Sequence, residues 1–151
     1  MQLDTILTPE RTLCRANASD KQQVLESCAR FLSESVPALD ADALLQSLLA
    51  RERLGSTGLG NGIAIPHCRL KNIDHVVGAL ITLAKPVEFE AVDDKLVDII
   101  FVLLAPAAAM QQHLNALAAL AELFNRSEFR DQLRNAETSA RLYQTAIEFN
   151  A

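Results

Sequence analysis

The residues most able to do chemistry in this chain gather in one segment, residues 55–70, which reads GSTGLGNGIAIPHCRL. Four of the five glycines fall in its first eight residues, and Ser56 and Thr57 add two hydroxyl groups. Backbone N–H groups in a glycine-rich loop can converge on an anion because no Cβ atoms obstruct them. Pro66, whose ring restricts the backbone, then leads directly into His67, one of only three histidines.

The chemistry that fits these residues is phosphoryl transfer to a histidine. A neutral imidazole nitrogen is a nucleophile, and cations and hydrogen-bond donors beside it spread the charge of the transferred group. Nucleotide binding is not supported: no lysine follows the glycines as in a Walker loop, and GxGxG replaces the dinucleotide-binding GxGxxG. The segment also lacks the GxSxG of a serine hydrolase, and His67 and Cys68 have no further ligands at metal spacing. The alternative is a turn-rich connection in which His67 is only a strand-end residue with a satisfied ring.

The elements before this segment are predicted from hydrophobic spacing. Residues 19–36 predict a helix, with Ser19 and Gln22 forming a capping box at its start. A second helix begins after its N-cap, Asp40, and carries Arg51 and Arg53 in its last turn, where cations suit the helix dipole. Residues 62–67 then predict a short strand that its proline ends or leaves at a sheet edge.

The rest of the chain predicts a buried sheet followed by helices. Residues 76–84 and 97–104 are continuous apolar runs of strand length, typical of central strands covered on both faces. From residue 106 onward the pattern turns helical, with a long amphipathic helix and two shorter ones over residues 127–135 and 139–149. We therefore expect one domain, an α/β (α+β) sandwich in which helices flank a central mixed β-sheet.

Composition limits the partners and the location of the protein. A formal net charge of −5, one tyrosine and no tryptophan argue against nucleic acid, whose binding needs a basic surface and usually stacking rings. Cys14, Cys28 and Cys68 form no CxxC pair, so we expect neither a disulfide framework nor a zinc site. The first ten residues lack a secretory pattern, and the longest apolar stretch is too short for a bilayer. We expect a cytoplasmic protein that is not embedded in a membrane.

Residues 55–70 resemble the active-site segment of the enzyme IIA domains of the bacterial phosphotransferase system. The features that match are Arg51, the Ser56-Thr57-Gly58 turn, the Gly-Asn-Gly run at 60–62 and the Ala-Ile-Pro-His run at 64–67. Residues 101–117, FVLLAPAAAMQQHLNAL, resemble the later strand and helix that bear a second histidine, here His113. The likeness is to the fructose/mannitol type, most closely its nitrogen-related branch, enzyme IIA-Ntr, and covers residues 1–151 as one type-2 enzyme IIA domain.

The resemblance implies that His67 accepts a phosphoryl group on Nε2 from an HPr-like phosphocarrier, NPr in the nitrogen branch. Enzyme I-Ntr and phosphoenolpyruvate stand upstream, and no metal or other cofactor is expected. His113 is expected to support the phosphoryl group and Arg51 to supply positive charge, while the loop itself predicts phosphate binding by Ser56, Thr57 and Gly58. The implied role is regulation of nitrogen metabolism and potassium homeostasis, through protein targets such as potassium transport or sensor kinase proteins.

Two alternatives stay open. A sugar-specific enzyme IIA that relays the group to a IIB permease component has the same site residues, and a regulatory binding module can keep the fold without taking phosphate. Taken without the resemblance, His113 also fits a buried histidine with a hydrogen-bond partner, and Arg51 is equivalent to Arg53 as a solvated helix-end cation. Cys68 stands where the family more often has glycine, and a thiol there raises the question of sensitivity to oxidation or alkylation.

Overall fold

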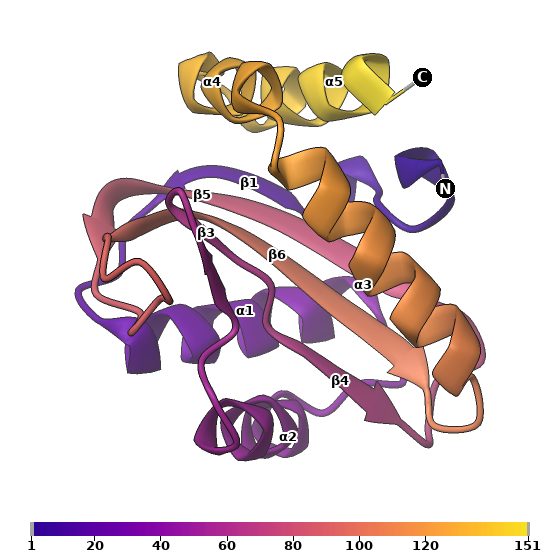
Figure 1. The fold of residues 1–151 in the computed structure, drawn as a ribbon. Helices are drawn as coiled ribbons and strands as arrows, with labels where there is room; N and C mark the ends of the chain where they lie inside the picture. Colours follow the sequence, from indigo (N-terminus) through magenta and orange to yellow (C-terminus); the bar gives the residue numbers. More distant parts are fainter. Residues whose placement is uncertain (1, 151) are drawn as a thin grey trace.

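The central strand is β6 (Val97–Pro106), formed by the second continuous apolar run. It pairs antiparallel with β5 (Val77–Val87) on one side and parallel with β3 (Ile63–Ala64) and β4 (His67–Leu70) on the other. The computed structural model describes residues 2–150, in which β1 (Thr12–Ala16) and β2 (Gly58–Gly60) complete the order β1-β5-β6-β3-β2, with β4 also paired to β6. The predicted mixed sheet is confirmed (Figure 1).

Helices cover both faces of this sheet, as predicted (Figure 1). One core joins the sheet to α1 (Lys21–Ser35) and α2 (Ala41–Arg53). The other joins it to α3 (Met110–Phe124), α4 (Ser127–Asn135) and α5 (Ser139–Asn150), with the N-terminal 3₁₀ turn Leu3–Thr5 beside them, while a second such turn, Pro9–Arg11, leads into β1.

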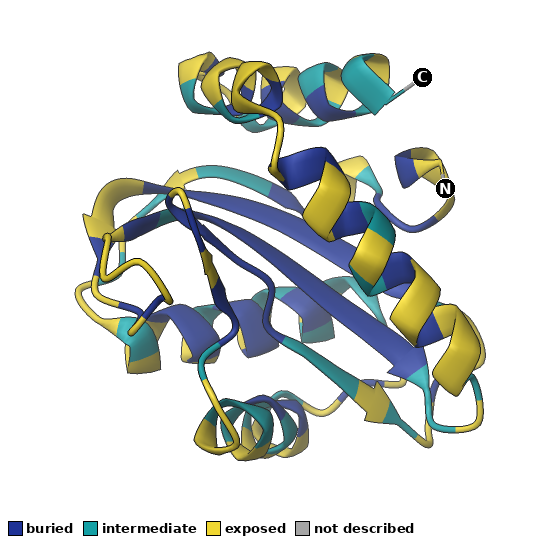
Figure 2. Cartoon of the chain, in the orientation of Figure 1, coloured by how far each residue is buried: buried dark blue, intermediate teal, exposed yellow. Residues whose placement is uncertain are grey.

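The side chains of β6 pack alternately into the two cores, because successive side chains of a strand point to opposite faces. Ile100, Val102 and Leu104 belong to the core under α1 and α2. Ile99 and Phe101 belong to the core under α3, α4 and α5. The strand is therefore buried along nearly its whole length, which explains its uninterrupted apolar sequence (Figure 2).

Helix starts agree with the sequence at α2 and differ by one residue at α1. The Asp40 side chain accepts the N–H of Ala43 over 2.9 Å, as predicted. At α1 the N-cap is Asp20 rather than Ser19, and its carboxylate accepts the N–H of Gln23 over 2.8 Å. The Gln23 side chain accepts from the N–H of Ser19, the residue before the N-cap, so the predicted Ser19–Gln22 capping box is wrong and Asp20 with Gln23 takes its place without the full reciprocal pair.

The strands differ from the prediction in two ways. The pattern does not predict β1 or β2, since their short, mixed sequences show neither alternation nor a continuous apolar run. The expected strand over residues 62–67 is divided, because β3 ends at Ala64 and β4 begins at His67. Pro66 lies in the gap with its carbonyl accepting the N–H of Leu103, so both pieces remain attached to β6.

Candidate functional site

His67 is held by its place in the sheet. It is half-buried at the first position of β4, where it pairs in register with Leu103 of β6. Its ring Nδ1 lies 2.7 Å from the carbonyl oxygen of Ile65. Because a carbonyl can only accept, Nδ1 carries the proton and Nε2 carries the lone pair. Nε2 is therefore the nucleophilic nitrogen of this ring.

Arg51, in the last turn of α2, contacts that nitrogen. Its Nε–H donates to Nε2 of His67 over 3.2 Å, and its Nη1 donates to the carbonyl of Gly55 over 2.8 Å. The second bond holds the guanidinium where α2 meets the glycine loop. Among residues 2–150, Arg53 makes no side-chain hydrogen bond or ion pair, although it lies in the same helical turn. The tertiary structure thus separates two arginines that spacing alone leaves equivalent.

His113, in the first turn of α3, is the second histidine that the structure brings to the site. Its ring centroid lies 5.3 Å from that of His67, and the two planes are inclined by 46°. Only 7 % of the residue is exposed, and its Nδ1 is buried without a hydrogen-bond partner among the described residues. The partner expected for an ordinary buried histidine is therefore missing at that atom. Protonating both nitrogens would leave a charged ring with an unsatisfied atom, so the neutral ring is favoured.

The surroundings keep both rings neutral near physiological pH. Burial is the largest effect on the pKa of His67 and lowers it. The hydrogen bond to the Ile65 carbonyl partly offsets burial, the charge of Arg51 lowers the pKa further, and Glu52 has the smallest, raising effect. Burial also lowers the pKa of His113, and the charges of Arg69 and Arg51 lower it further. A neutral imidazole is the form that can attack phosphorus.

The Ser56-Thr57-Gly58 turn lies beside the site with its donors bound to protein groups. The Thr57 amide lies 3.2 Å from a carboxylate oxygen of Glu52, and the Thr57 hydroxyl also donates to that carboxylate. The Ser56 hydroxyl donates to the Phe89 carbonyl over 2.6 Å and accepts the N–H of Gly58 over 3.0 Å. Phosphate binding by this turn stays a prediction. Glu52 is a residue of this region that sequence reasoning missed, although it directly follows Arg51.

Part of the glycine run has a structural explanation. A Cβ at Gly58 would lie 2.8 Å from the Cβ of Ala91, so the turn packs closely against the loop between β5 and β6. Gly60, at the end of β2, and Asn61 and Gly62, which form the turn to β3, all have positive φ, a conformation that favours glycine. These glycines therefore shape the hairpin that leads into His67.

The two residues that follow His67 in β4, Cys68 and Arg69, also affect what the site can do. Burial raises the pKa of the Cys68 thiol to about 12, so it stays protonated and weakly nucleophilic near neutral pH. Arg69 is exposed and donates to the Ala107 carbonyl over 3.0 Å, which places a second cation on this face of the molecule. Within residues 2–150, no three His, Cys, Asp or Glu side chains gather as metal ligands.

Comparison with known proteins identifies the family to which the chain belongs. The family described as "Phosphoenolpyruvate-dependent sugar phosphotransferase system, EIIA 2" matches residues 5–148. The chain belongs to this EIIA 2 family. The resemblance found in residues 51–67 and 101–117 is therefore confirmed.

Relatives within the EIIA 2 family identify the branch. The chain is 44 % identical over 148 residues to the nitrogen regulatory protein of Pseudomonas aeruginosa, covering 98 % of this chain and 96 % of that one. The crystal structure of nitrogen regulatory protein IIA-Ntr from Neisseria meningitidis matches with a TM-score of 0.87 at 34 % identity, covering 95 % of this chain and 98 % of that one. The IIA mannitol structure from Escherichia coli matches at a TM-score of 0.74 and 16 % identity over 90 % of this chain and 96 % of that one, which shows a shared fold. These similarities support a regulatory role of the EIIA type. No helix in residues 2–150 is long and apolar enough to cross a membrane.

Proposed function

We propose that this EIIA 2 protein is a cytoplasmic phosphocarrier of a nitrogen-related phosphotransferase system, and that Nε2 of His67 accepts the phosphoryl group. The observation that carries the proposal is the pair of hydrogen bonds on the His67 ring. The Ile65 carbonyl holds the proton on Nδ1, and Nε2 is directed toward the guanidinium of Arg51. A nucleophile facing a cation is the arrangement that transfer of an anionic group requires.

The donor is a phosphorylated HPr-like carrier, NPr in the nitrogen branch. In an in-line transfer, Nε2 of His67 forms a new P–N bond while the P–N bond of the protonated donor ring breaks, and the donor leaves as neutral imidazole. Positive charge then develops on the His67 ring, where the Nδ1–H bond to the Ile65 carbonyl stabilises it. The Arg51 Nε–H moves from Nε2 to a phosphoryl oxygen, and His113, whose ring centroid lies 5.3 Å from that of His67, donates an N–H to another.

Phosphorylation then acts as a signal. Adding a charge of about −2 beside Arg51 and Arg69 offsets their positive charge and changes the local electrostatic potential sharply, so that partners meet two different surfaces. The relatives named nitrogen regulatory proteins support targets that regulate nitrogen metabolism. Potassium transport or sensor kinase proteins, and through them potassium homeostasis, belong to the same proposal.

A second candidate is a relay to a sugar-specific IIB component. The family description names a sugar phosphotransferase system, and the fold is shared with a mannitol IIA protein. The acceptor chemistry is the same in both cases, so the two candidates differ only in their donors and targets.

The test is incubation with phosphoenolpyruvate, enzyme I-Ntr and NPr, followed by intact-mass and acid-lability analysis. We expect one acid-labile phosphate that is absent in His67→Ala and present in His75→Ala, a matched control because His75 is exposed and its ring contacts the Asp74 carboxylate instead of the His67 ring. Uptake only from the sugar-branch enzyme I and HPr favours the relay. No uptake from either set overturns the phosphocarrier proposal and favours a regulatory binding module of the same fold.

A further inference from the structure

We propose that Glu52 is a positioning residue for the phosphoryl acceptor. Its carboxylate ties the glycine loop to the end of α2, and this tie keeps Arg51 and His67 in their mutual arrangement. The inference rests on the proposed role of His67, and it assigns a task to a side chain that touches neither histidine.

The Glu52 side chain is buried, and its carboxylate is both hydrogen-bonded and ion-paired. Its side chain is 6 % exposed, although it lies in the last turn of a helix next to a loop. The carboxylate accepts from the amide and the hydroxyl of Thr57 and forms an ion pair with Lys21, whose Nζ lies 2.7 Å away. A buried carboxylate is costly unless it is paired and hydrogen-bonded, and all of these partners serve that purpose.

One route of hydrogen bonds leads from Glu52 to the acceptor ring. Thr57, held by Glu52, accepts the N–H of Ile65 with its own carbonyl over 3.0 Å. The carbonyl of Ile65 then accepts from Nδ1 of His67 over 2.7 Å. The bond that places the proton on Nδ1 therefore depends on a strand end that the Glu52 contact supports.

A second route leads from Glu52 to the cation. Gly55 lies two residues before Thr57, and its carbonyl accepts from Nη1 of Arg51 over 2.8 Å. Moving Thr57 moves that carbonyl, and with it the guanidinium whose Nε contacts His67. Both hydrogen bonds of the acceptor ring thus end at segments joined to the same carboxylate.

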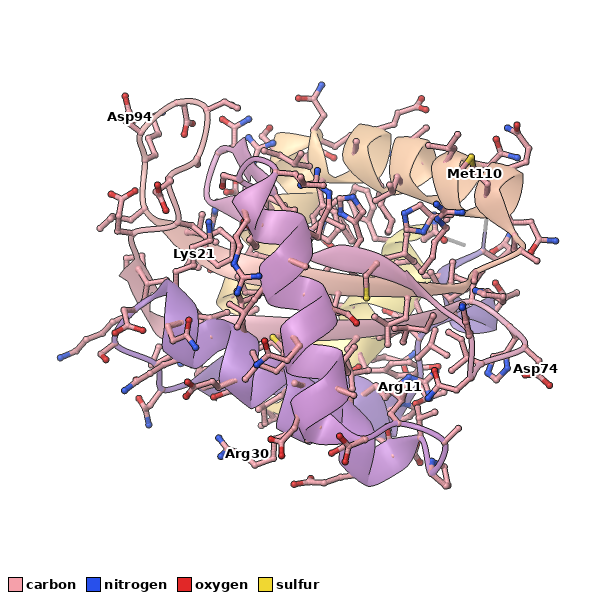
Figure 3. The ribbon with its side chains drawn as sticks, turned by 90° about the horizontal axis from the view of Figure 1, so that it is seen from below. Arg11, Lys21, Arg30, Asp74, Asp94 and Met110 are labelled. Atoms are coloured by element: carbon pink, nitrogen blue, oxygen red, sulfur yellow. The ribbon has the colours of Figure 1, made fainter. Side chains whose placement is uncertain are left out.

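Lys21 explains why this carboxylate does not weaken the site. Adjacent carboxylate and guanidinium groups attract each other, yet Glu52 and Arg51 form no ion pair in the described part of the chain. Lys21, at the start of α1, takes the carboxylate instead, packs over the Phe89 ring at 4.8 Å and lies 3.7 Å from Glu90. Figure 3 shows Lys21 at the same end of the molecule as the Asp94 loop, with Asp74 and Met110 at the opposite end. The charge of Arg51 is left available for a phosphoryl group.

The experiment separates the reach of the side chain from its charge. Glu52→Asp keeps the charge and shortens the reach, whereas Glu52→Gln keeps the reach and an accepting oxygen without the charge. Glu90→Gln is the matched control, since Glu90 contacts the same Lys21 with a side chain that is 78 % exposed. The readouts are the rate of phosphorylation by phosphorylated NPr, the ¹⁵N shifts of the His67 ring in the unphosphorylated protein, and near-UV circular dichroism for folding.

We expect Glu52→Asp to slow phosphorylation on the order of 10- to 100-fold, the scale of a misplacement near 1 Å. Its His67 shifts should move toward a mixture of the two tautomers while the circular dichroism stays native. Glu52→Gln should keep the wild-type His67 shifts and a phosphorylation rate within a few-fold of the wild type. Glu90→Gln should match the wild type in both the shifts and the rate.

Two results overturn the proposal. One is a Glu52→Asp protein with wild-type rate and wild-type His67 shifts, and the other is a reversed order in which Gln is impaired and Asp is not. The ¹⁵N shifts do not require phosphorylation. A wild-type protein that takes no phosphate therefore refutes the proposed function, while the tautomer of His67 in Glu52→Asp still decides the role of Glu52.

Discussion

Replacing Arg51 with alanine removes the only cation that contacts the nucleophilic nitrogen among residues 2–150. The change deletes the Nε–H bond to His67 at 3.2 Å and the Nη1 bond to the Gly55 carbonyl at 2.8 Å. Gly55 is exposed, so water replaces the second bond and the loss in the free energy of unfolding should stay near or below about 1 kcal/mol. The effect on transfer should be much larger.

The size of that effect follows from what the guanidinium does in the transition state. Removing one preorganised donor from a developing negative charge typically costs about 2.7–4 kcal/mol, or 10²- to 10³-fold in rate. We therefore expect Arg51→Ala to accept phosphate from phosphorylated NPr about 10²- to 10³-fold more slowly in single-turnover experiments. Arg53→Ala is the matched control, because it removes the same charge from the same helical turn without touching His67.

A second readout follows from the electrostatics of the same pair. The charge of Arg51 is one of the causes that lower the pKa of His67, so Arg51→Ala should raise that pKa in an NMR titration. Arg53→Ala should leave it close to the wild-type value. Equal transfer rates for Arg51→Ala and Arg53→Ala, with both proteins folded, would refute the assignment of Arg51 to the site.

Three further predictions concern stability and reactivity. Because burial lowers the pKa of His113 below the ordinary 6.5, the unfolded chain binds that proton more readily, and the free energy of unfolding should fall as the pH drops below about 6.5. The slope is at most about 1.4 kcal/mol per pH unit for this histidine; urea titrations from pH 7.5 to 5 should show a shallower slope in His113→Gln, and an unchanged one contradicts the reasoning. Gly58→Ala should lower the free energy of unfolding by about 1–3 kcal/mol, because its Cβ would lie 2.8 Å from that of Ala91; wild-type stability in the same assay contradicts this close packing. Cys68, with a pKa raised to about 12, should react with iodoacetamide at pH 7.5 far more slowly than a free thiol, and rapid labelling of this residue in peptide mass analysis contradicts its burial.

The sequence by itself predicts those elements whose start or burial depends on residues close together in the chain. Asp40 marks the start of α2 because an N-cap needs only a side-chain acceptor near the first free N–H groups. The apolar runs of β5 and β6 predict central strands because a strand covered on both faces has no polar side to show. The motif around His67 also identifies the candidate acceptor and the family, since its residues are consecutive.

The tertiary structure alone decided which side chains meet. β4 runs parallel to β6, and β6 leads into α3. The pairing of His67 with Leu103 therefore brings the candidate acceptor close to His113 in the first turn of α3. Neither periodicity nor spacing encodes such a contact, because it depends on strands pairing across distant parts of the chain. For the same reason the sequence does not predict β1, which is held by its pairing with β5.

The finer chemistry of the site depends on the same long-range contacts. Arg51 and Arg53 have equal helix propensity and charge, and only the direction in which each side chain leaves α2 separates them. The proton on Nδ1 of His67 is set by the Ile65 carbonyl, whose orientation follows from the break between β3 and β4. The sequence by itself thus determines the family and identifies the candidate acceptor, because both depend on neighbouring residues. Which nitrogen is nucleophilic, and which cation faces it, depends on hydrogen bonds that exist only once the sheet has formed.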